Sequence, residues 1–509
     1  MKNRNVLRST ALLTLSGIAA KTIDFVFRSY YSRQLGSEGL GLFSLCFAVH
    51  GIMLNIASGG FGVAVSKIIS ERLSKGEIGE AKGTMRLALS TVGALSVCAI
   101  LVTCMFSEGI ATRFLNEPEC AKSLVCLAPS IFFMGISYCL KGYFYASRKV
   151  FPPASSEFLE QAVKIASITY LLSKMLPKGV EQGCEAVFLG ISIGEFSSCL
   201  YLSVIYMFDI GRFKDIRCAK LKNLAAPLFK IALPVALGAV SGSFIRMREQ
   251  VLTVEALEGA GLSHKSALKL YGGIYGMAMP MIVFPLTLLS SCFTMLVPEI
   301  SRAYSAASSV RLKTLTSRIY RFCGFFGFLV MCVMFVFSRE LSVLVYGTTE
   351  CAGYLNVLSL LVPVMFMDSV SCGILNGMGK QSSMFWYGIL DALGRSVLIV
   401  TFVPIYGVRA LFLIIVCSNI FTCTLTAGKA HMTAKIHFGW IDRFLKHGLS
   451  ALIAGFVSGS LSYMLFSGDA VVFGGIFLTI LVYSVADLCL SNALRADFGW
   501  VKGRMFFNT

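Results

Sequence analysis

Charged residues are scarce in this chain. Only 14% of its 509 residues are Asp, Glu, Lys or Arg, while 56% are hydrophobic, whereas soluble globular proteins carry about 25% charged residues. One soluble core cannot bury so much apolar surface, and no long polar stretch remains for a separate soluble domain. The composition therefore excludes a soluble protein and predicts a helical membrane bundle.

The sequence also lacks the motifs on which catalysis and metal binding depend. It contains no nucleotide-binding loop, no Ser/His/Asp set and no cluster among its five histidines. Its 17 cysteines form no CxxC pair and no Cys/His group with zinc spacing, and most lie in apolar segments, where cysteine is a small packing residue. We therefore expect no enzyme, no metal site, no cofactor and no ATP-driven pump.

Apolar windows of about 20 residues, each long enough to cross about 30 Å of hydrocarbon, recur along the whole chain. They predict an all-α polytopic membrane protein of about fourteen transmembrane helices. In the first half the expected spans are 10–32, 41–66, 84–106, 123–147, 154–176, 186–208 and 227–255. In the second half they are 270–297, 319–338, 353–377, 384–403, 408–430, 447–466 and 471–491. The glycine-rich run 58–62 and the prolines Pro280 and Pro285 predict breaks within the second and eighth spans.

The net charge of +18 follows the order of the spans. Lys and Arg number 29 in one set of alternate loops and span ends and 9 in the other. Because such residues collect on the cytoplasmic side, we expect a protein of the inner (cytoplasmic) membrane with both termini in the cytoplasm, and nucleic acid is not needed to explain the charge. The first apolar run continues past Lys21 and Asp24, so we expect a retained helix rather than a signal peptide.

An internal repeat relates the two halves of the chain. A shift of 234 residues aligns 127–149 with 361–383, and the spans then fall in matching order. We expect an N-lobe of six helices in 1–222, a C-lobe of six helices in 223–435, and two further helices with a cytoplasmic tail in 436–509. Paired lobes that rock about a shared site are a common transporter plan, although a purely structural duplication would leave the same pattern.

Cations inside the membrane are the strongest indication of a site. Lys21, Asp24 and Arg28 share one face of the first helix, and Arg246 and Glu249 are three residues apart in the seventh. Each buried charge is costly unless it faces protein or water, so such residues mark functional sites by default. Internal salt bridges or side chains that snorkel to the interface are the competing interpretation.

Further intramembrane charges occur in the fifth, sixth and eleventh spans. Glu157, Glu160, Gln161 and Lys164 lie on one face of the fifth. The sixth span adds Glu195, and in the eleventh Asp391 and Arg395 are four residues apart. A wet cavity lined by Lys and Arg suits a phosphate or pyrophosphate, because guanidinium groups match phosphate oxygens, whereas a cavity for cationic drugs should present uncompensated carboxylates. The predicted substrate-binding residues are Lys21, Arg28, Arg246 and Arg395, and the predicted supporting or coupling residues are Asp24, Glu249, Asp391, Glu157 and Glu160.

Three stretches resemble a known family. They are ALKLYGGIYGMAMPMIVFPLTLLSSCFTMLVPEISRA (267–303), FGVAVSKIISERLSKGE (61–77) and AAKTIDFVFRSYYSRQLGSEGLGLFSL (19–45). The chain resembles the stage V sporulation protein B-like, polysaccharide flippase branch of the multidrug, oligosaccharidyl-lipid and polysaccharide (MOP) exporter superfamily, related to lipid II flippases. The resemblance implies two six-helix lobes and a cavity lined by basic residues. Lys21 matches the first basic position of the first helix, while Phe27 rather than Arg28 aligns with the second.

The leading hypothesis is a flippase that moves an undecaprenyl-pyrophosphate-linked oligosaccharide or lipid II from the cytoplasmic to the outer leaflet by alternating access, in cell-wall or polysaccharide biosynthesis. The membrane potential or a coupling ion, H⁺ or Na⁺, would drive it. Its partners would be the lipid-linked glycan and membrane lipids, and we expect a monomer. Two alternatives stay open: a cation-coupled multidrug exporter, and a non-transporting membrane scaffold whose intramembrane charges are all paired.

Overall fold

A computed structural model of the protein describes residues 2–211, 221–294, 296–306, 309–434, 440–466 and 470–490. Within these residues the secondary structure is helical and no strand occurs, which confirms the all-α prediction. Helices satisfy every backbone hydrogen bond inside the segment itself, as hydrocarbon demands. The predicted tail beyond residue 490 and the basic stretch 212–220 lie outside the described residues.

The chain divides into two compact units. The first holds the residues up to 258 together with 262–272, and the second holds 259–261 and the residues from 273 onward. The lobe boundaries expected at 222/223 and 435/436 stay predictions. The helices of the first unit are α1 (Lys2–Ser58), α2 (Phe61–Ser74), α3 (Ile78–Met105), α4 (Ser107–Gly109), η1 (Ile110–Phe114), α5 (Cys120–Ala146), α6 (Phe151–Met175), η2 (Leu176–Lys178), α7 (Val180–Gly211), α8 (Leu221–Gly259) and α9 (His264–Tyr271).

Glycines break the first long helix in two places. Gly36 has a φ of 66° inside α1, so this helix contains both the first expected span and most of the second. Gly60 has a φ of 79° and separates α1 from α2. A Cβ on Gly60 would lie 2.3 Å from the carbonyl oxygen of Ala232 in α8, so only glycine allows this close approach. The break predicted for the run 58–62 is confirmed.

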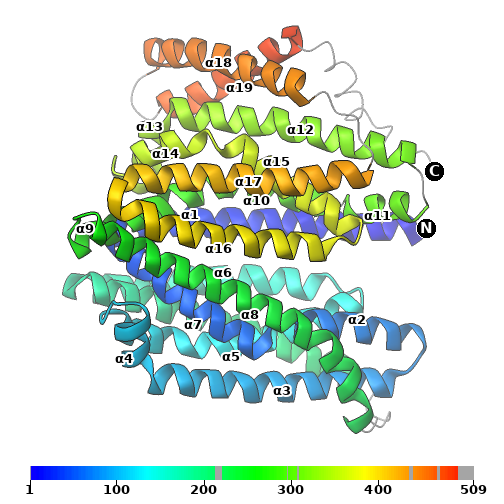
Figure 1. The fold of residues 1–509 in the computed structure, drawn as a ribbon. Helices are drawn as coiled ribbons and strands as arrows, with labels where there is room; N and C mark the ends of the chain where they lie inside the picture. The colour runs from blue at the N-terminus through cyan, green and yellow to red at the C-terminus, as the bar shows by residue number, and fades with distance from the viewer. Residues whose placement is uncertain are drawn as a thin grey trace. The chain divides into compact units, whose positions relative to one another are not determined.

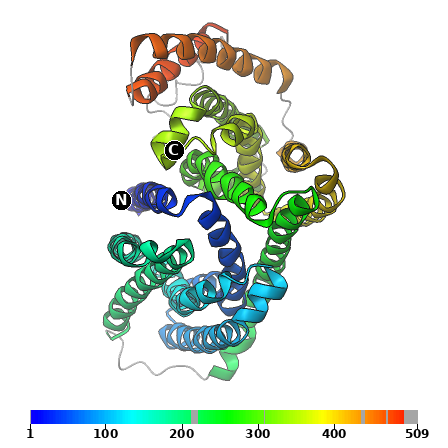
Figure 2. The ribbon, with the colours of Figure 1, turned by 90° about the vertical axis from the view of Figure 1, so that its left-hand side faces the viewer.

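Small residues also set the packing of α6 against α7. A Cβ on Gly190 would lie 2.3 Å from Cγ1 of Ile168, and a Cβ on Gly194 would lie 2.9 Å from Cβ of Lys164. Glycines four residues apart let membrane helices approach closely. The charged residue next to Gly194, Glu195, is therefore held where α7 crosses α6. Figure 2 looks roughly along the axes of several helices of this unit, which run nearly parallel.

The second unit is built in the same way from long apolar helices. They are η3 (Gly272–Ala278), α10 (Met279–Thr294), α11 (Val297–Ser305), α12 (Ser309–Val336), α13 (Ser338–Tyr346), α14 (Ala352–Ser359), α15 (Val362–Gly377), α16 (Gln381–Tyr406), α17 (Val408–Ala434), α18 (Trp440–Leu465) and α19 (Ala470–Leu490). A π-helical segment precedes Pro280, where the sequence predicts a break in the eighth span. The last two helices lie beside α12 through Phe328, Cys332, Ala454 and Tyr483 (Figure 1).

Eleven helices in the described part of the chain are long and apolar enough to cross a membrane, or up to twelve if the bent pair α14 and α15 is one span. This makes the chain a multi-pass membrane protein. The segment 16–74 counts once in that number although it contains two of the expected spans. The span predicted at 154–176 is helical as α6 but carries Glu157, Glu160 and Lys164, which lower its hydropathy. The count of fourteen stays a prediction.

Candidate functional site

A cavity of about 480 Å³ lies within the first unit, among α1, α5, α6, α7 and α8. Its polar lining is formed by Asp24, Arg28, Ser44, Glu160, Lys164, Glu195, Ser243, Arg246 and Gln250. The aromatic rings of Tyr31, Phe43 and Phe47 also line it. Phe43 stacks on Phe47 at a centroid distance of 5.1 Å, so part of the wall is apolar and rigid. The cavity thus combines an aromatic wall with charges of both signs.

Helix α1 presents its polar face to this cavity, as the i, i+4 spacing of Asp24 and Arg28 requires. Arg28 is half-buried, and its Nε is a buried donor that has no hydrogen-bond acceptor among the described residues. A buried donor without a partner costs free energy unless water or a ligand accepts from it. Arg28 is therefore positioned to donate to a guest in the cavity.

Helix α8 contributes a second arginine to the lining of this cavity. Arg246 is exposed to the cavity, and its Nη2 donates to Oγ of Ser243 at 3.0 Å. The same Ser243 oxygen accepts from Nδ2 of Asn55 in α1 at 2.9 Å, which ties the two helices together beside the cavity. Glu249 is buried and is not among the residues that line the cavity.

A second cavity, of about 350 Å³, adjoins the first. The two share five lining residues: Asp24, Met134, Glu160, Lys164 and Glu195. Lys21 lines this second cavity rather than the first, as do Lys141, Glu157 and Gln161. The structure thus brings six of the nine predicted site residues to two neighbouring cavities, and it separates Lys21 from Arg28 and Arg246 by cavity.

Ion pairs occupy part of the second cavity. Nζ of Lys164 lies 2.6 Å from Oδ1 of Asp24, and Nε2 of Gln161 donates to the same oxygen at 3.3 Å. Nζ of Lys141 lies 3.4 Å from Oε1 of Glu157. Asp24 and Glu157 therefore have cationic partners on neighbouring helices, which is the arrangement expected of structural as well as functional charges.

Two further predicted residues, Asp391 and Arg395, lie in the second unit. Nη2 of Arg395 lies 3.5 Å from Oδ2 of Asp391, and Oγ of Ser418 donates to the other oxygen of that carboxylate at 2.7 Å. Neither Arg395 nor Asp391 lines the two cavities of the first unit. Their roles as a substrate ligand and a coupling group stay predictions.

Several lining residues were not among the predicted site residues, although the sequence analysis noted Lys164 and Glu195 as intramembrane charges. Lys164 and Glu195 line both cavities, and Gln250 follows Arg246 by four residues on the same face of α8. The polar spacing of Ser243, Arg246 and Gln250 carried that signal, since a polar stripe in an apolar helix avoids lipid. For Phe43 no signal existed, because phenylalanine is common in any transmembrane helix.

A polar cluster lies outside the expected spans 227–255 and 270–297, between α5, α8 and α9. Nε2 of His264 lies 2.8 Å from Oε1 of the buried Glu117, and its Nδ1 bonds Glu258. These hydrogen bonds, first to Glu117 and then to Glu258, raise the pKa of His264, while burial raises the pKa of Glu117. Nζ of Lys265 lies 2.9 Å from Oε1 of Glu38. By the predicted orientation this cluster is extracytoplasmic.

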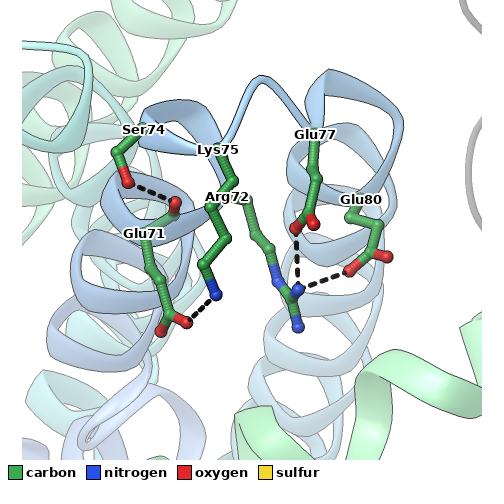
Figure 3. Close-up of polar contacts among 6 residues, drawn as sticks. All are labelled: Glu71, Arg72, Ser74, Lys75, Glu77 and Glu80. Carbon is green, nitrogen blue, oxygen red and sulfur yellow. Dashed lines mark hydrogen bonds and ion pairs between the residues drawn. The ribbon is translucent and has the colours of Figure 1, made fainter.

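The turn between α2 and α3 carries a second surface cluster (Figure 3). Nη1 of Arg72 lies 2.8 Å from Oε2 of Glu77 and 3.1 Å from Oε2 of Glu80, so one guanidinium joins both helices. Lys75 pairs with Glu71 at 2.7 Å, and this hydrogen bond lowers the pKa of Glu71. These contacts join the end of α2 to the start of α3.

Comparisons with known proteins agree with this architecture. The chain is 24% identical to stage V sporulation protein B of Bacillus subtilis (strain 168) over 471 residues, which cover 91% of this chain and 90% of that protein. The solved structure of "Lipid II flippase MurJ, inward closed conformation" superposes with a TM-score of 0.68 at 15% identity, covering 95% of this chain and 100% of that one. An inward-facing multidrug resistance MATE family transporter of the MOP superfamily gives a TM-score of 0.66 at 14% identity, covering 82% and 94%.

Residues 6–304, more than half of the chain, match a family described as "Polysaccharide biosynthesis protein". This match covers nearly all of the first unit, including every residue that lines the two cavities. The chain therefore belongs to the polysaccharide biosynthesis protein family, and it has the fold of solved transporters of the MOP superfamily.

Proposed function

We propose that the protein is a flippase that moves a lipid-linked glycan with a pyrophosphate group from the cytoplasmic to the outer leaflet. Its substrate would be an undecaprenyl-pyrophosphate-linked oligosaccharide or lipid II. The observation that carries the proposal is the pair of guanidinium groups, Arg28 and Arg246, on facing helices of one cavity inside the membrane bundle. Guanidinium forks match phosphate oxygens, so two of them in one cavity suit a diphosphate.

The cavity would favour the headgroup through hydrogen bonds and charge together. Arg28 has a free buried donor and Arg246 is exposed to the cavity, so both can turn donors toward phosphate oxygens. Apolar walls strengthen these contacts because the local dielectric is lower than that of water. The aromatic rings of Phe43 and Phe47 give an apolar surface on which the face of a sugar ring can pack.

Alternating access would then carry the headgroup across while the lipid chain stays in the bilayer. We propose that the membrane potential or an H⁺ or Na⁺ gradient drives it, that both termini are cytoplasmic, that the protein acts as a monomer, and that its work is transport without chemistry on the glycan. The name of the B. subtilis relative places that protein in sporulation, so we propose envelope or spore-wall assembly as the setting.

A flipping assay in reconstituted vesicles tests the proposal. Lipid II and other undecaprenyl-pyrophosphate-linked glycans are offered in parallel, and wild type is compared with Arg28→Ala and Arg246→Ala. Arg248→Ala is the matched control, since Arg248 is adjacent on α8 and does not line the cavity. We expect flipping of at least one glycan by wild type and by the control, and flipping slowed about 10- to 100-fold in both cavity variants. Equal flipping by all four proteins would contradict pyrophosphate binding by Arg28 and Arg246, which we call the guanidinium clamp. If wild type flips none of the glycans, the proposed function is wrong.

A cation-coupled multidrug exporter is the second candidate. The carboxylates of Glu160 and Glu195 line both cavities, and a cationic drug would require such groups. Drug resistance on overexpression, lost in Glu160→Gln but kept in Arg28→Ala, would favour the exporter over the flippase.

A further inference from the structure

Two carboxylates at the junction of the cavities are unlike the others in the site. Asp24 and Glu157 each pair with a lysine. Glu160 of α6 and Glu195 of α7 make no ion pair or hydrogen bond within the described part of the chain, and each lines both cavities. The close crossing of α6 and α7 at Gly194 keeps the two carboxylates near one another, so their negative charges repel.

The charges around this pair do not balance in the second cavity. Four carboxylates line it against three ammonium groups, which leaves one negative charge in excess if all are ionised. In addition, Oε1 of Gln161, a residue that is only 9% exposed, lines this cavity without a hydrogen-bond donor among the described residues. Protonation of one carboxylate would remove the excess negative charge and would supply a hydrogen-bond donor for the buried acceptor.

The groups that face Glu160 and Glu195 come from every neighbouring helix. They are Lys21, Asp24, Arg28 and Tyr31 of α1, Tyr138 and Lys141 of α5, Glu157 and Lys164 of α6, and Arg246 of α8. Two of the neighbouring lysines already have carboxylate partners: Lys141 pairs with Glu157, and Lys164 pairs with Asp24. Besides Lys164, the positive charges that line the first cavity together with the pair are the guanidinium groups of Arg28 and Arg246.

We propose that Glu160 and Glu195 take up one shared proton when an anionic headgroup enters the first cavity. The inference rests on the proposed function, because the headgroup is the ligand of Arg28 and Arg246. A diphosphate that binds these guanidinium groups brings further negative charge into the cavity that the carboxylate pair lines, and two carboxylates in a site of low dielectric then cannot both stay ionised. One carboxyl accepts a proton from water, and its O–H then donates to the other carboxylate. Proton and headgroup binding become mutually favourable, as linkage requires.

Calorimetric titration of the purified full-length protein measures this proton directly. Inorganic pyrophosphate and undecaprenyl pyrophosphate are titrated in buffers of different protonation enthalpy, and the dependence of the heat on the buffer gives the number of protons taken up. We expect about one more proton for wild type than for Glu160→Gln or Glu195→Gln. Glu185→Gln, which changes a carboxylate on α7 outside both cavities, should match wild type. Lower pH should tighten binding about tenfold per unit in wild type over the titration range.

The outcomes separate the inference from the proposed function. Binding with no proton uptake, or with the same uptake in wild type and in Glu195→Gln, overturns the shared proton while the guanidinium clamp stands. Binding of neither probe to wild type removes the clamp and the inference with it. Size-exclusion profiles identify a variant that does not fold, and two single variants at neighbouring positions give independent readings of the same proton.

Discussion

The two units of the molecule hold their intramembrane charges in different ways. In the first, Arg28, Arg246, Glu160 and Glu195 line cavities of about 480 and 350 Å³. In the second, the carboxylate of Asp391 contacts Arg395 and Ser418, and that of Asp368 accepts a hydrogen bond from Thr426 at 2.7 Å. A repeated architecture therefore does not imply a repeated site, because Asp391 and Arg395, unlike the charges of the first unit, line neither of these cavities.

The largest expected effect is a difference in flipping rate between variants of two arginines, Arg246 and Arg395, which the sequence predicts equally as substrate-binding residues. Arg246→Ala should slow flipping about 10- to 100-fold, since a charge-assisted hydrogen bond contributes about 1.5–3 kcal/mol. Arg395→Ala should slow flipping only severalfold, because the guanidinium of Arg395 already forms an ion pair with Asp391. Initial flipping rates in vesicles at equal protein content measure both. A larger loss for Arg395→Ala would reverse the comparison and place a substrate contact in the second unit.

Glycine packing should matter in the first unit and much less at an open position in the second. Gly190→Ala places a Cβ 2.3 Å from Ile168, so α6 and α7 must separate, at a cost of about 1–3 kcal/mol of stability. Gly394→Ala in α16 meets nothing within 4 Å and should be neutral or stabilise by up to about 1 kcal/mol. Thermal unfolding in detergent compares the two. Similar losses would show that the crossing of α6 and α7 can relax.

The His264 cluster predicts a dependence of stability on pH. The folded pKa values of His264 and Glu117 are both raised, so the stabilisation is complete below their unfolded pKa values and is lost as pH rises through the folded ones. For His264 this window begins above 6.5. The melting temperature should therefore fall as pH rises from 6 to 9, and His264→Gln should flatten the curve. An unchanged slope in that variant would contradict the assignment.

The smallest effect is expected at the turn between α2 and α3. Arg72→Ala removes contacts to Glu77 and Glu80 at the surface and should cost about 1 kcal/mol or less, as exposed ion pairs usually do. High salt should reduce the difference further. Unfolding at low and high ionic strength checks this. A loss as large as that of Gly190→Ala would show that the turn supports the fold of the whole first unit.

The local pattern of residues determined the fold class and one face of the site. Apolar windows predicted the helices, glycine positions predicted the break between α1 and α2, and the helical period placed Asp24 and Arg28 on one side of α1. These features depend on residues only a few positions apart, so a single sequence contains all the information that they need.

Only the tertiary structure decided which charges meet. Arg28 shares a cavity with Arg246, and Lys21 lines the neighbouring one, although Lys21 and Arg28 are on the same helix face. Lys164 neutralises Asp24 from another helix, and Glu195 reaches the cavities because Gly194 lets α7 approach α6. Cavities and ion pairs between helices depend on how individual side chains pack against one another. The residues involved are far apart in the chain, so the periodic pattern of the sequence does not predict which of them meet.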